Sequence, residues 1–215
     1  VPKVPYRETI KKVAEGQGKY KKQTGGHGQY GDVWLRLEPA SEYGFEWRIT
    51  GGVIPSKYQE AIEEGIKEAA KKGVLAGFPV MGFKAIVYNG SYHEVDSSDL
   101  AFQIAASLAF KKVMAEAHPV LLEPIYRLKV LVPQERVGDV LSDLQARRGR
   151  ILGMEQEGAL SVVHAEVPLA EVLEYYKALP GLTGGAGAYT LEFSHYAEVP
   201  PHLAQRIVQE RAQEG

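Results

Sequence analysis

The sequence has 215 residues, no cysteine and a formal net charge of −2, and 45% of its residues are hydrophobic. Because domains usually run to about 100 to 150 residues, a chain of this length is predicted to form two. The absence of cysteine excludes disulfide bonds, thiolate metal sites and a cysteine nucleophile. No apolar run approaches the roughly 20 residues that cross a bilayer, and no secretory leader is present, which predicts a cytoplasmic protein.

Apolar residues at every second position predict strands in the first part of the chain. Residues 30–37 and 45–49 show this alternation, and residues 83–88 form a third strand-like run. The alternating residues of the first two segments are Val33, Leu35, Leu37, Phe45, Trp47 and Ile49. A β-sheet is therefore expected before residue 90.

Two helices are predicted in the same part. The first begins at Pro55 and ends at Gly73, with apolar residues at near-helical spacing between them. The second begins near Asp96 and Ser97, which can cap a helix, and ends at His118. Its apolar residues at a spacing of four are Leu100, Ile104 and Leu108.

Beyond Pro119 the pattern starts again as a second unit. Two helical segments share apolar positions at i, i+3, i+4 and i+7. These positions are Val137, Val140, Leu141 and Leu144 in the first segment and Leu169, Val172, Leu173 and Tyr176 in the second. Strand-like runs at 126–132, 151–155, 161–167 and 188–195 flank them, which gives the order βαββαβ of a ferredoxin-like domain. A short terminal helix is predicted from Pro200.

Motifs for catalysis or metal binding are missing. The sequence contains no phosphate-binding loop, no Gly-x-Ser-x-Gly elbow and no His-Glu-x-x-His pair. The six histidines are scattered, without the spacing of metal ligands. The prediction is that this chain is not an enzyme and has no catalytic residue, cofactor site or metal site of its own.

One glycine motif resembles a dinucleotide site. Residues 26–31, Gly-His-Gly-Gln-Tyr-Gly, match Gly-x-Gly-x-x-Gly, whose chemistry needs a strand before the glycines and a helix after them. Here a strand-like segment follows, so a nucleotide site is rejected in favour of a turn that uses glycine's backbone freedom. Residues 1–22 nearby hold seven basic and two acidic side chains, which favours a solvated strand face with a weak preference for anions.

Several long motifs, in one order, resemble elongation factor G. Domain IV of that family is matched by residues 23–31 (QTGGHGQYG), 51–55 (GGVIP) and 88–98 (YNGSYHEVDSS). Its domain V is matched by residues 122–125 (LEPI), 138–140 (GDV), 146–154 (ARRGRILGM) and 167–171 (VPLAE). The resemblance covers nearly the whole chain, and such a set of motifs is far more specific than a lone glycine fingerprint.

The resemblance implies an α+β fold of two domains. Residues 1–121 would form a βαβ domain like one in a small-subunit ribosomal protein, residues 122–199 a ferredoxin-like domain, and residues 200–215 a helical tail. It also implies an incomplete molecule, which agrees with a first residue that is Val rather than Met. GTP and magnesium would belong to GTPase domains upstream of this chain, with which it would act.

The resemblance also implies RNA contacts. Two loop tips of domain IV would reach tRNA and mRNA in the decoding centre of the ribosome, with Gln29 and His93 as polar contacts. The implied tip residues are Gly25, Gly26, His27, Gly28, Gln29, Tyr30, Ser91, Tyr92 and His93. Arg147, Arg148 and Arg150 would lie near large-subunit rRNA, although cations at a helix end also favour the helix dipole.

Two departures from the family separate this chain from its usual pattern. His27 stands where the family usually has Arg, and residues 184–187 are Gly-Gly-Ala-Gly where the family has a Gln-Gly-Arg-Gly turn. Both remove a permanent positive charge, which weakens attraction to phosphate. A diverged paralogue is therefore expected. Promotion of translocation is the main hypothesis; ribosome recycling or ribosome protection, and a small-molecule phosphotransferase of related βαβ fold, are the alternatives.

Overall fold

The computed structural model describes residues 3–214, and these form two compact units. The N-terminal unit comprises residues 7–121 together with 199–214, and the C-terminal unit comprises residues 122–198 together with 3–6. Each unit has its own sheet and its own buried core. No helix within the described residues is long and apolar enough to cross a membrane.

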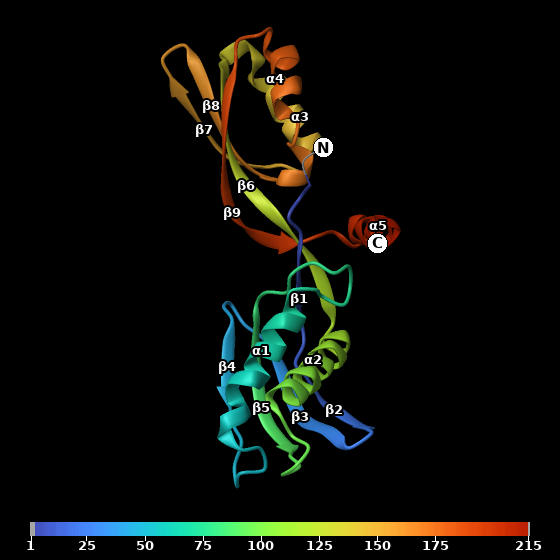
Figure 1. Cartoon of the computed structure of the whole chain (residues 1–215). Coiled ribbons are helices and arrows are strands. Elements are labelled where there is room, and N and C mark those ends of the chain that lie inside the picture. The colour runs from blue at the N-terminus through green and yellow to red at the C-terminus, as the bar shows by residue number, and fades with distance from the viewer. Residues whose placement is uncertain (1–2, 215) are drawn as a thin grey trace. The chain divides into compact units, whose positions relative to one another are not determined.

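The N-terminal unit is built on a four-stranded sheet with the order β2-β3-β5-β4. The strands are β2 (Ala14–Thr24), β3 (His27–Pro39), β4 (Gly44–Trp47) and β5 (Phe83–Ser91). β2, β3 and β5 pair antiparallel, whereas β4 and β5 pair parallel and are joined through α1 (Gln59–Ala70), which forms the expected βαβ crossover. A short β1 (Arg7–Ile10) precedes the sheet, and α2 (Asp99–Glu116) lies beside α1 on one face (Figure 1).

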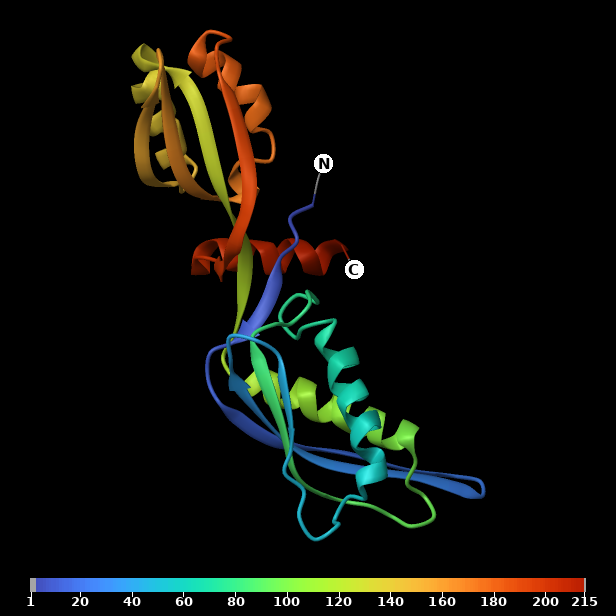
Figure 2. The same cartoon turned by 90° about the vertical axis from the view of Figure 1, so that its left-hand side faces the viewer.

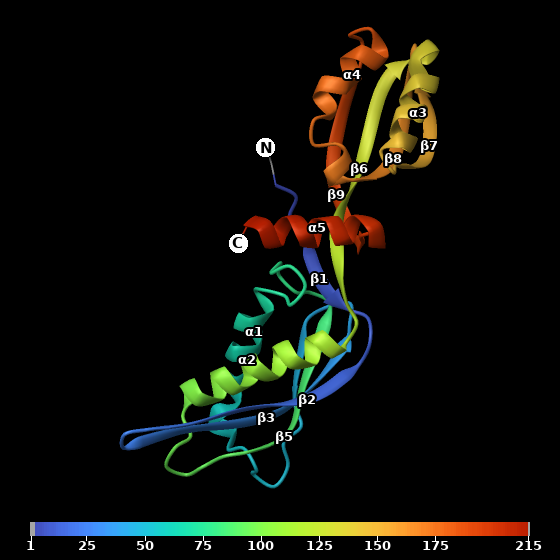
Figure 3. The same cartoon turned by 90° about the vertical axis from the view of Figure 1, so that its right-hand side faces the viewer.

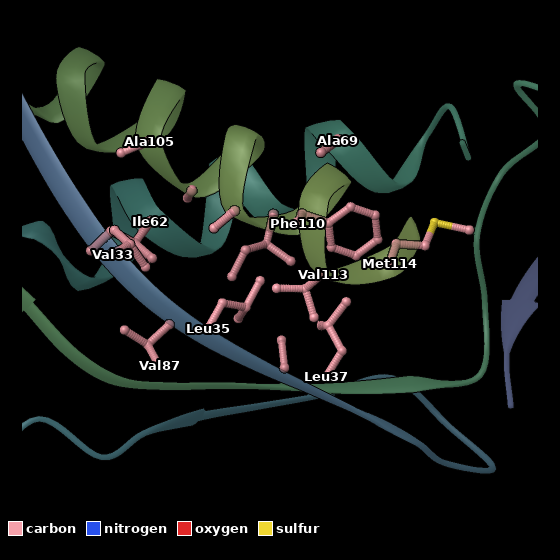
Figure 4. Close-up of a cluster of buried hydrophobic side chains, with 14 of the residues drawn as sticks. Val33, Leu35, Leu37, Ile62, Ala69, Val87, Ala105, Phe110, Val113 and Met114 are labelled. Carbon is pink, nitrogen blue, oxygen red and sulfur yellow. The ribbon is translucent and has the colours of Figure 1, made fainter. Parts of the chain in front are cut away.

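The alternation in the sequence predicts the core of this unit correctly. Val33, Leu35 and Leu37 on β3 are all fully buried and face the helices (Figure 4). α2 packs closely on the sheet because Gly18 on β2 leaves room for it: a Cβ added at Gly18 would lie 2.2 Å from the carbonyl oxygen of Ala105. The strand therefore needs glycine at this contact with the backbone of α2.

The second helix differs from its prediction in two ways. Its N-cap is Ser98, whose hydroxyl accepts a hydrogen bond from the Ala101 amide, rather than Asp96 or Ser97. The buried face of α2 consists of alanines, two phenylalanines, Val113 and Met114, while Leu100 and Leu108 are exposed. The leucine spacing identifies the helix but not the face that packs on the sheet.

The C-terminal unit has the predicted ferredoxin-like order βαββαβ. Its elements are β6 (Pro119–Pro133), α3 (Val137–Ala146), β7 (Arg150–Glu157), β8 (Leu160–Pro168), α4 (Tyr175–Thr183) and β9 (Ala188–Glu198). Its four strands have the order β9-β6-β8-β7, and these three neighbouring pairs are antiparallel; β1 also pairs with β6 in the same sheet. Both helices lie on one face of this sheet (Figure 1), where Leu128, Val140 and Val163 are among the fully buried side chains.

The second helix of this unit begins later than predicted. Leu169 belongs to a short 3-10 turn, Leu169–Glu171, and α4 starts only at Tyr175. Tyr175 is fully buried and Tyr176 is exposed, the reverse of the predicted apolar face. The break after the turn shifts the helical phase by one residue.

The predicted terminal helix is α5 (Pro201–Glu214), which groups with the N-terminal unit. Arg211 anchors its last turn: Nε donates to the Ala76 carbonyl at 3.0 Å, and the guanidinium lies 4.6 Å from the centre of the Phe78 ring. The loop that receives Arg211 is itself held by Glu8, a fully buried carboxylate that accepts hydrogen bonds from the amides of Leu75, Ala76 and Phe78.

Candidate nucleic-acid interface

The glycine motif forms the turn of a long hairpin. Thr24 pairs with His27 across β2 and β3, and Gly25 and Gly26 make the two-residue turn with φ values of 49° and 134°. Positive φ at both positions favours glycine, as tight hairpin turns require. The strand predicted after the glycines is confirmed, since β3 begins at His27, whereas a dinucleotide-binding turn leads into a helix. We call residues 24–30 the hairpin tip.

The second loop, residues 91–97, folds around His93. The His93 amide donates to Ser97 Oγ at 2.9 Å, and the Ser97 amide donates back to the His93 carbonyl at 2.9 Å. His93 Nδ1 accepts from the Asp96 amide at 3.3 Å and lies 3.6 Å from Asp96 Oδ2. These bonds make a compact turn, which we call the histidine tip.

The two tips are joined to each other. The Tyr30 amide donates to the Asp96 carbonyl at 3.0 Å, and Ser97 Oγ donates to the Tyr30 carbonyl at 2.9 Å. The rings of Tyr30 and His93 lie 6.2 Å apart. Gly28 lets the tips approach, because a Cβ there would come within 2.6 Å of Asp96 Oδ2. Figures 2 and 3 show the hairpin and the β5–α2 loop at the same end of the unit.

A buried carboxylate holds the base of both tips. Asp32 on β3 accepts hydrogen bonds from Gln17 Nε2 of β2 at 2.7 Å and from Ser91 Oγ of β5 at 2.6 Å. Since the single Ser91 hydroxyl proton goes to Asp32, the Tyr30 hydroxyl donates to Ser91 at 2.7 Å. One side chain thus links the three strands where they enter the tips. The motif comparison identified Ser91 and Tyr30 but missed Asp32 and Gln17, which no local pattern distinguishes.

The predicted tip residues differ in what they present to solvent. The His93 side chain is 56% exposed, and Tyr92 and His27 are also exposed. The carbonyl oxygen of the Gln29 side chain is buried and accepts no hydrogen bond from the described residues. Ser91 faces inward to Asp32. His93 and Tyr92 can bond a 2′-hydroxyl or stack on a base, and Gln29 points its acceptor away from such contacts.

Lysines provide positive charge beside the tips. Lys19, Lys21 and Lys22 are exposed on β2, and Lys19 Nζ lies 5.5 Å from the centre of the Tyr30 ring. Arg36, farther along β3, is committed instead to Glu38 and Glu15 at 2.7 Å each. Its hydrogen bond holds the pKa of Glu15 below the usual value. Near the tip the hairpin therefore carries exposed lysines that form no ion pair within residues 3–214, whereas farther along β3 the charge of Arg36 is balanced by Glu15 and Glu38.

The arginines of the C-terminal unit mostly bind carboxylates within the unit. Arg147 Nε donates to Asp143 at 2.8 Å, and its Nη1 donates to the Glu171 carbonyl at 2.6 Å. Arg148 makes two 2.8 Å hydrogen bonds to Glu123, a residue that is only 3% exposed. These bonds raise the pKa of Arg148. Both guanidinium groups are structural in this arrangement, which leaves little of either for rRNA.

Arg150 differs from its two neighbours. Its side chain is 75% exposed, and its only ion pair within residues 3–214, to Glu166, spans 3.4 Å. An ion pair this exposed contributes little to stability, so Arg150 can leave Glu166 and bind a phosphate instead. Residues 184–187 are exposed as well, and Gly184 at the end of α4 has a φ of 64°. Among the three predicted arginines, only Arg150 keeps a largely free cation.

Two family profiles together match nearly the whole chain. The profile for elongation factor G, domain IV, matches residues 2–118, and the profile for the elongation factor G C-terminus matches residues 120–207. Elongation factor G of Aquifex pyrophilus is 52% identical over 98% of this chain and 30% of its own length. Elongation factor G-like protein of Thermotoga maritima is 52% identical over 99% of this chain and 32% of its own length. The chain thus spans about a third of the length of the curated relatives it matches.

Proposed function

Because the chain belongs to the elongation factor G family, we propose that it is the ribosome- and RNA-contacting arm of a translational GTPase that promotes movement of tRNA and mRNA in the cytoplasm. The observation that supports this most is the joined pair of tips. Glycines at the hairpin turn allow close backbone approach, His93 and Tyr92 are exposed beside them, and exposed lysines lie nearby on β2. This combination suits phosphate, ribose and base contacts together.

The proposed mechanism is mechanical. Domains outside this chain bind GTP and magnesium and drive the movement, while the tips hold the tRNA and mRNA in the decoding centre against backward slip. No proton transfer is required of His93, and no residue of this chain takes part in hydrolysis. Arg150 is the proposed contact to large-subunit rRNA, since Arg147 and Arg148 are committed to neighbouring acids.

The test uses the complete factor with His93→Ala. Single-round translocation is expected to slow by about tenfold, which corresponds to about 1.4 kcal/mol of barrier, while GTP hydrolysis on ribosomes stays nearly normal. The matched control is His202→Ala, which removes an exposed histidine on α5, away from the tips. If hydrolysis and movement fall together, the holding role is wrong.

A second candidate is ribosome recycling. His27 and the Gly-Gly-Ala-Gly segment at 184–187 lack the arginines of the family pattern and are exposed. Loss of two cations weakens phosphate binding, so the factor would stay bound to the ribosome for a shorter time. The same factor should then split ribosomes with recycling factor present and fail in translocation. His27→Arg tests whether the missing charge explains a failure in translocation. If it does, the variant should translocate; if the factor is a recycling factor for another reason, the variant should still fail.

A further inference from the structure

An apolar stripe on α2 faces outward instead of into the core. Leu100 is 57% exposed and Leu108 is 43% exposed, with Ile104 between them on the same stripe. Together with the outer side of α1 these residues line a groove of about 460 Å³. A residue in the stripe recurs every fourth position, which is about 6 Å along the helix. Leu100, Ile104 and Leu108 thus form an apolar stripe about two turns long, and the other lining residues of α2, Gln103, Ser107 and Lys111, are polar.

Close contact between the two helices forms the base of the groove. A Cβ at Gly65 of α1 would lie 2.4 Å from the Gln103 carbonyl of α2, so only glycine permits this approach. Each helix then contributes one wall. The site is therefore a fixed feature of helix packing, and not a gap left by mobile side chains.

Charge on the α1 wall narrows the choice of occupant. Glu64 and Glu68 both line the groove, one turn apart. Glu64 forms no ion pair within residues 3–214, and Glu68 pairs only with Lys71, where both side chains are about 70% exposed. Among the described residues, Lys111 is the single cation that lines the groove, and none of the lining residues is aromatic. RNA would meet two carboxylates and no ring to stack on, which disfavours it.

We propose that this groove docks a basic amphipathic helix of a partner protein. Apolar side chains of the partner, spaced by three or four residues, would lie along Leu100, Ile104 and Leu108, as in helix-in-groove recognition. Its lysines or arginines would pair with Glu64 and Glu68. The proposal is independent of the RNA role of the tips, because the groove and the tips share no residue.

The test is NMR titration of the isotope-labelled 215-residue chain. The probe is a synthetic helical peptide of about 15 residues with leucines on one face and lysines beside them. Two comparison ligands are the same peptide with glutamates in place of lysines and an oligouridine of about 12 nucleotides. The basic peptide should shift amide signals of Leu100, Ile104 and Leu108 and bind at least about tenfold more tightly than the acidic one.

Matched variants locate the binding. Leu108→Glu should weaken the basic peptide by about tenfold or more, whereas Leu152→Glu, at a leucine that is also 43% exposed but lies on β7, should change nothing. The double variant Glu64→Gln/Glu68→Gln should bind the basic peptide about threefold to tenfold more weakly, and Glu60→Gln on the same helix should bind it unchanged.

Four outcomes would overturn the proposal. They are equal binding of the two peptides, amide shifts outside the groove, groove shifts caused by oligouridine, and filling of the groove by self-association of the chain.

Discussion

The hairpin and histidine tips and the arginine cluster of the C-terminal unit were both predicted to contact RNA, yet they use their polar groups in opposite ways. In the tips, backbone amides, serines and a buried aspartate fix the shape, and His93 and Tyr92 stay exposed. In the cluster, the charged side chains themselves fix the shape, and Arg147 and Arg148 are occupied by nearby acids.

The difference shows that positive charge in a sequence does not establish a free cation. A bidentate arginine bound to a buried carboxylate has already exchanged its solvation for protein contacts. Release of such a group to a phosphate would strand the carboxylate. An exposed histidine, in contrast, can bind a ligand without breaking the fold.

The largest expected effect comes from Arg148→Ala. It strands Glu123, which is buried, and should lower the free energy of unfolding of the C-terminal unit by about 3 kcal/mol. Urea denaturation followed by hydrogen exchange in each unit measures this. Adding Glu123→Gln to the variant removes the stranded charge and should recover about half of the loss. A loss below about 0.5 kcal/mol, the contribution of an exposed ion pair, would mean that Arg148 is not structural.

Asp32→Ala should have the next largest effect, now in the tips. It removes the acceptor for Gln17 and Ser91, and a charged hydrogen-bond acceptor is worth about 2 kcal/mol. Hydrogen exchange at the Tyr30 and Ser97 amides, which close the tips, should accelerate. Asp32→Asn keeps one acceptor and should lose about 1 kcal/mol. Equal losses in both variants, with unchanged exchange at the tips, would contradict the role of Asp32.

The strands and most helices could be predicted because one local pattern determines each of them. Val33, Leu35 and Leu37 occupy every second position of a strand, so all three point to the same face of the sheet, which is the buried one. The start of α2 is harder to predict from the sequence, because four consecutive residues, 96–99, are all of types that can cap a helix. The choice of Ser98 follows from tertiary contacts, since Ser97 is occupied with Tyr30 and His93.

The buried face of α2 and the fate of the arginines depend on residues distant in sequence. Gly18 brings α2 so close to the sheet that alanines pack there, although hydrophobicity alone favours the leucines. Glu123 lies 25 residues before Arg148, and no motif links the two. The family resemblance identified the tips, but it could not show that Asp32 supports them or that Gln29 turns its oxygen inward.

Tyr175→Phe tests which part of a side chain the arginine cluster uses. The Arg147 guanidinium lies 5.1 Å from the centre of the Tyr175 ring, whereas the Tyr175 hydroxyl is buried without a hydrogen-bond partner among the described residues. Removal of an unsatisfied hydroxyl should stabilise the unit by about 1 kcal/mol. Tyr189→Phe, at the neighbouring ring, is the control and should be nearly neutral. Destabilisation by Tyr175→Phe would show that the hydroxyl has a function.

The same variant should change the response to alkaline pH. Burial raises the pKa of Tyr175 to about 12 from 10.0, so the folded state favours the neutral phenol. The raised pKa contributes to the free energy of unfolding. This contribution is fully present below pH 10 and is lost as the pH rises through about 12. The native chain should therefore lose stability in that window more steeply than the Phe variant. Parallel curves for the two proteins would contradict the burial effect.

The smallest expected effects on stability are those of His93→Ala and Arg150→Ala, the exposed members of the two regions. Each should change the free energy of unfolding by no more than about 0.5 kcal/mol, because the histidine tip keeps its backbone and serine bonds and the Arg150 pair is solvated. Urea denaturation of both variants beside Arg148→Ala provides the measurement. A large loss from His93→Ala would mean that the imidazole supports the tip, and reduced translocation by that variant could no longer be assigned to a lost RNA contact.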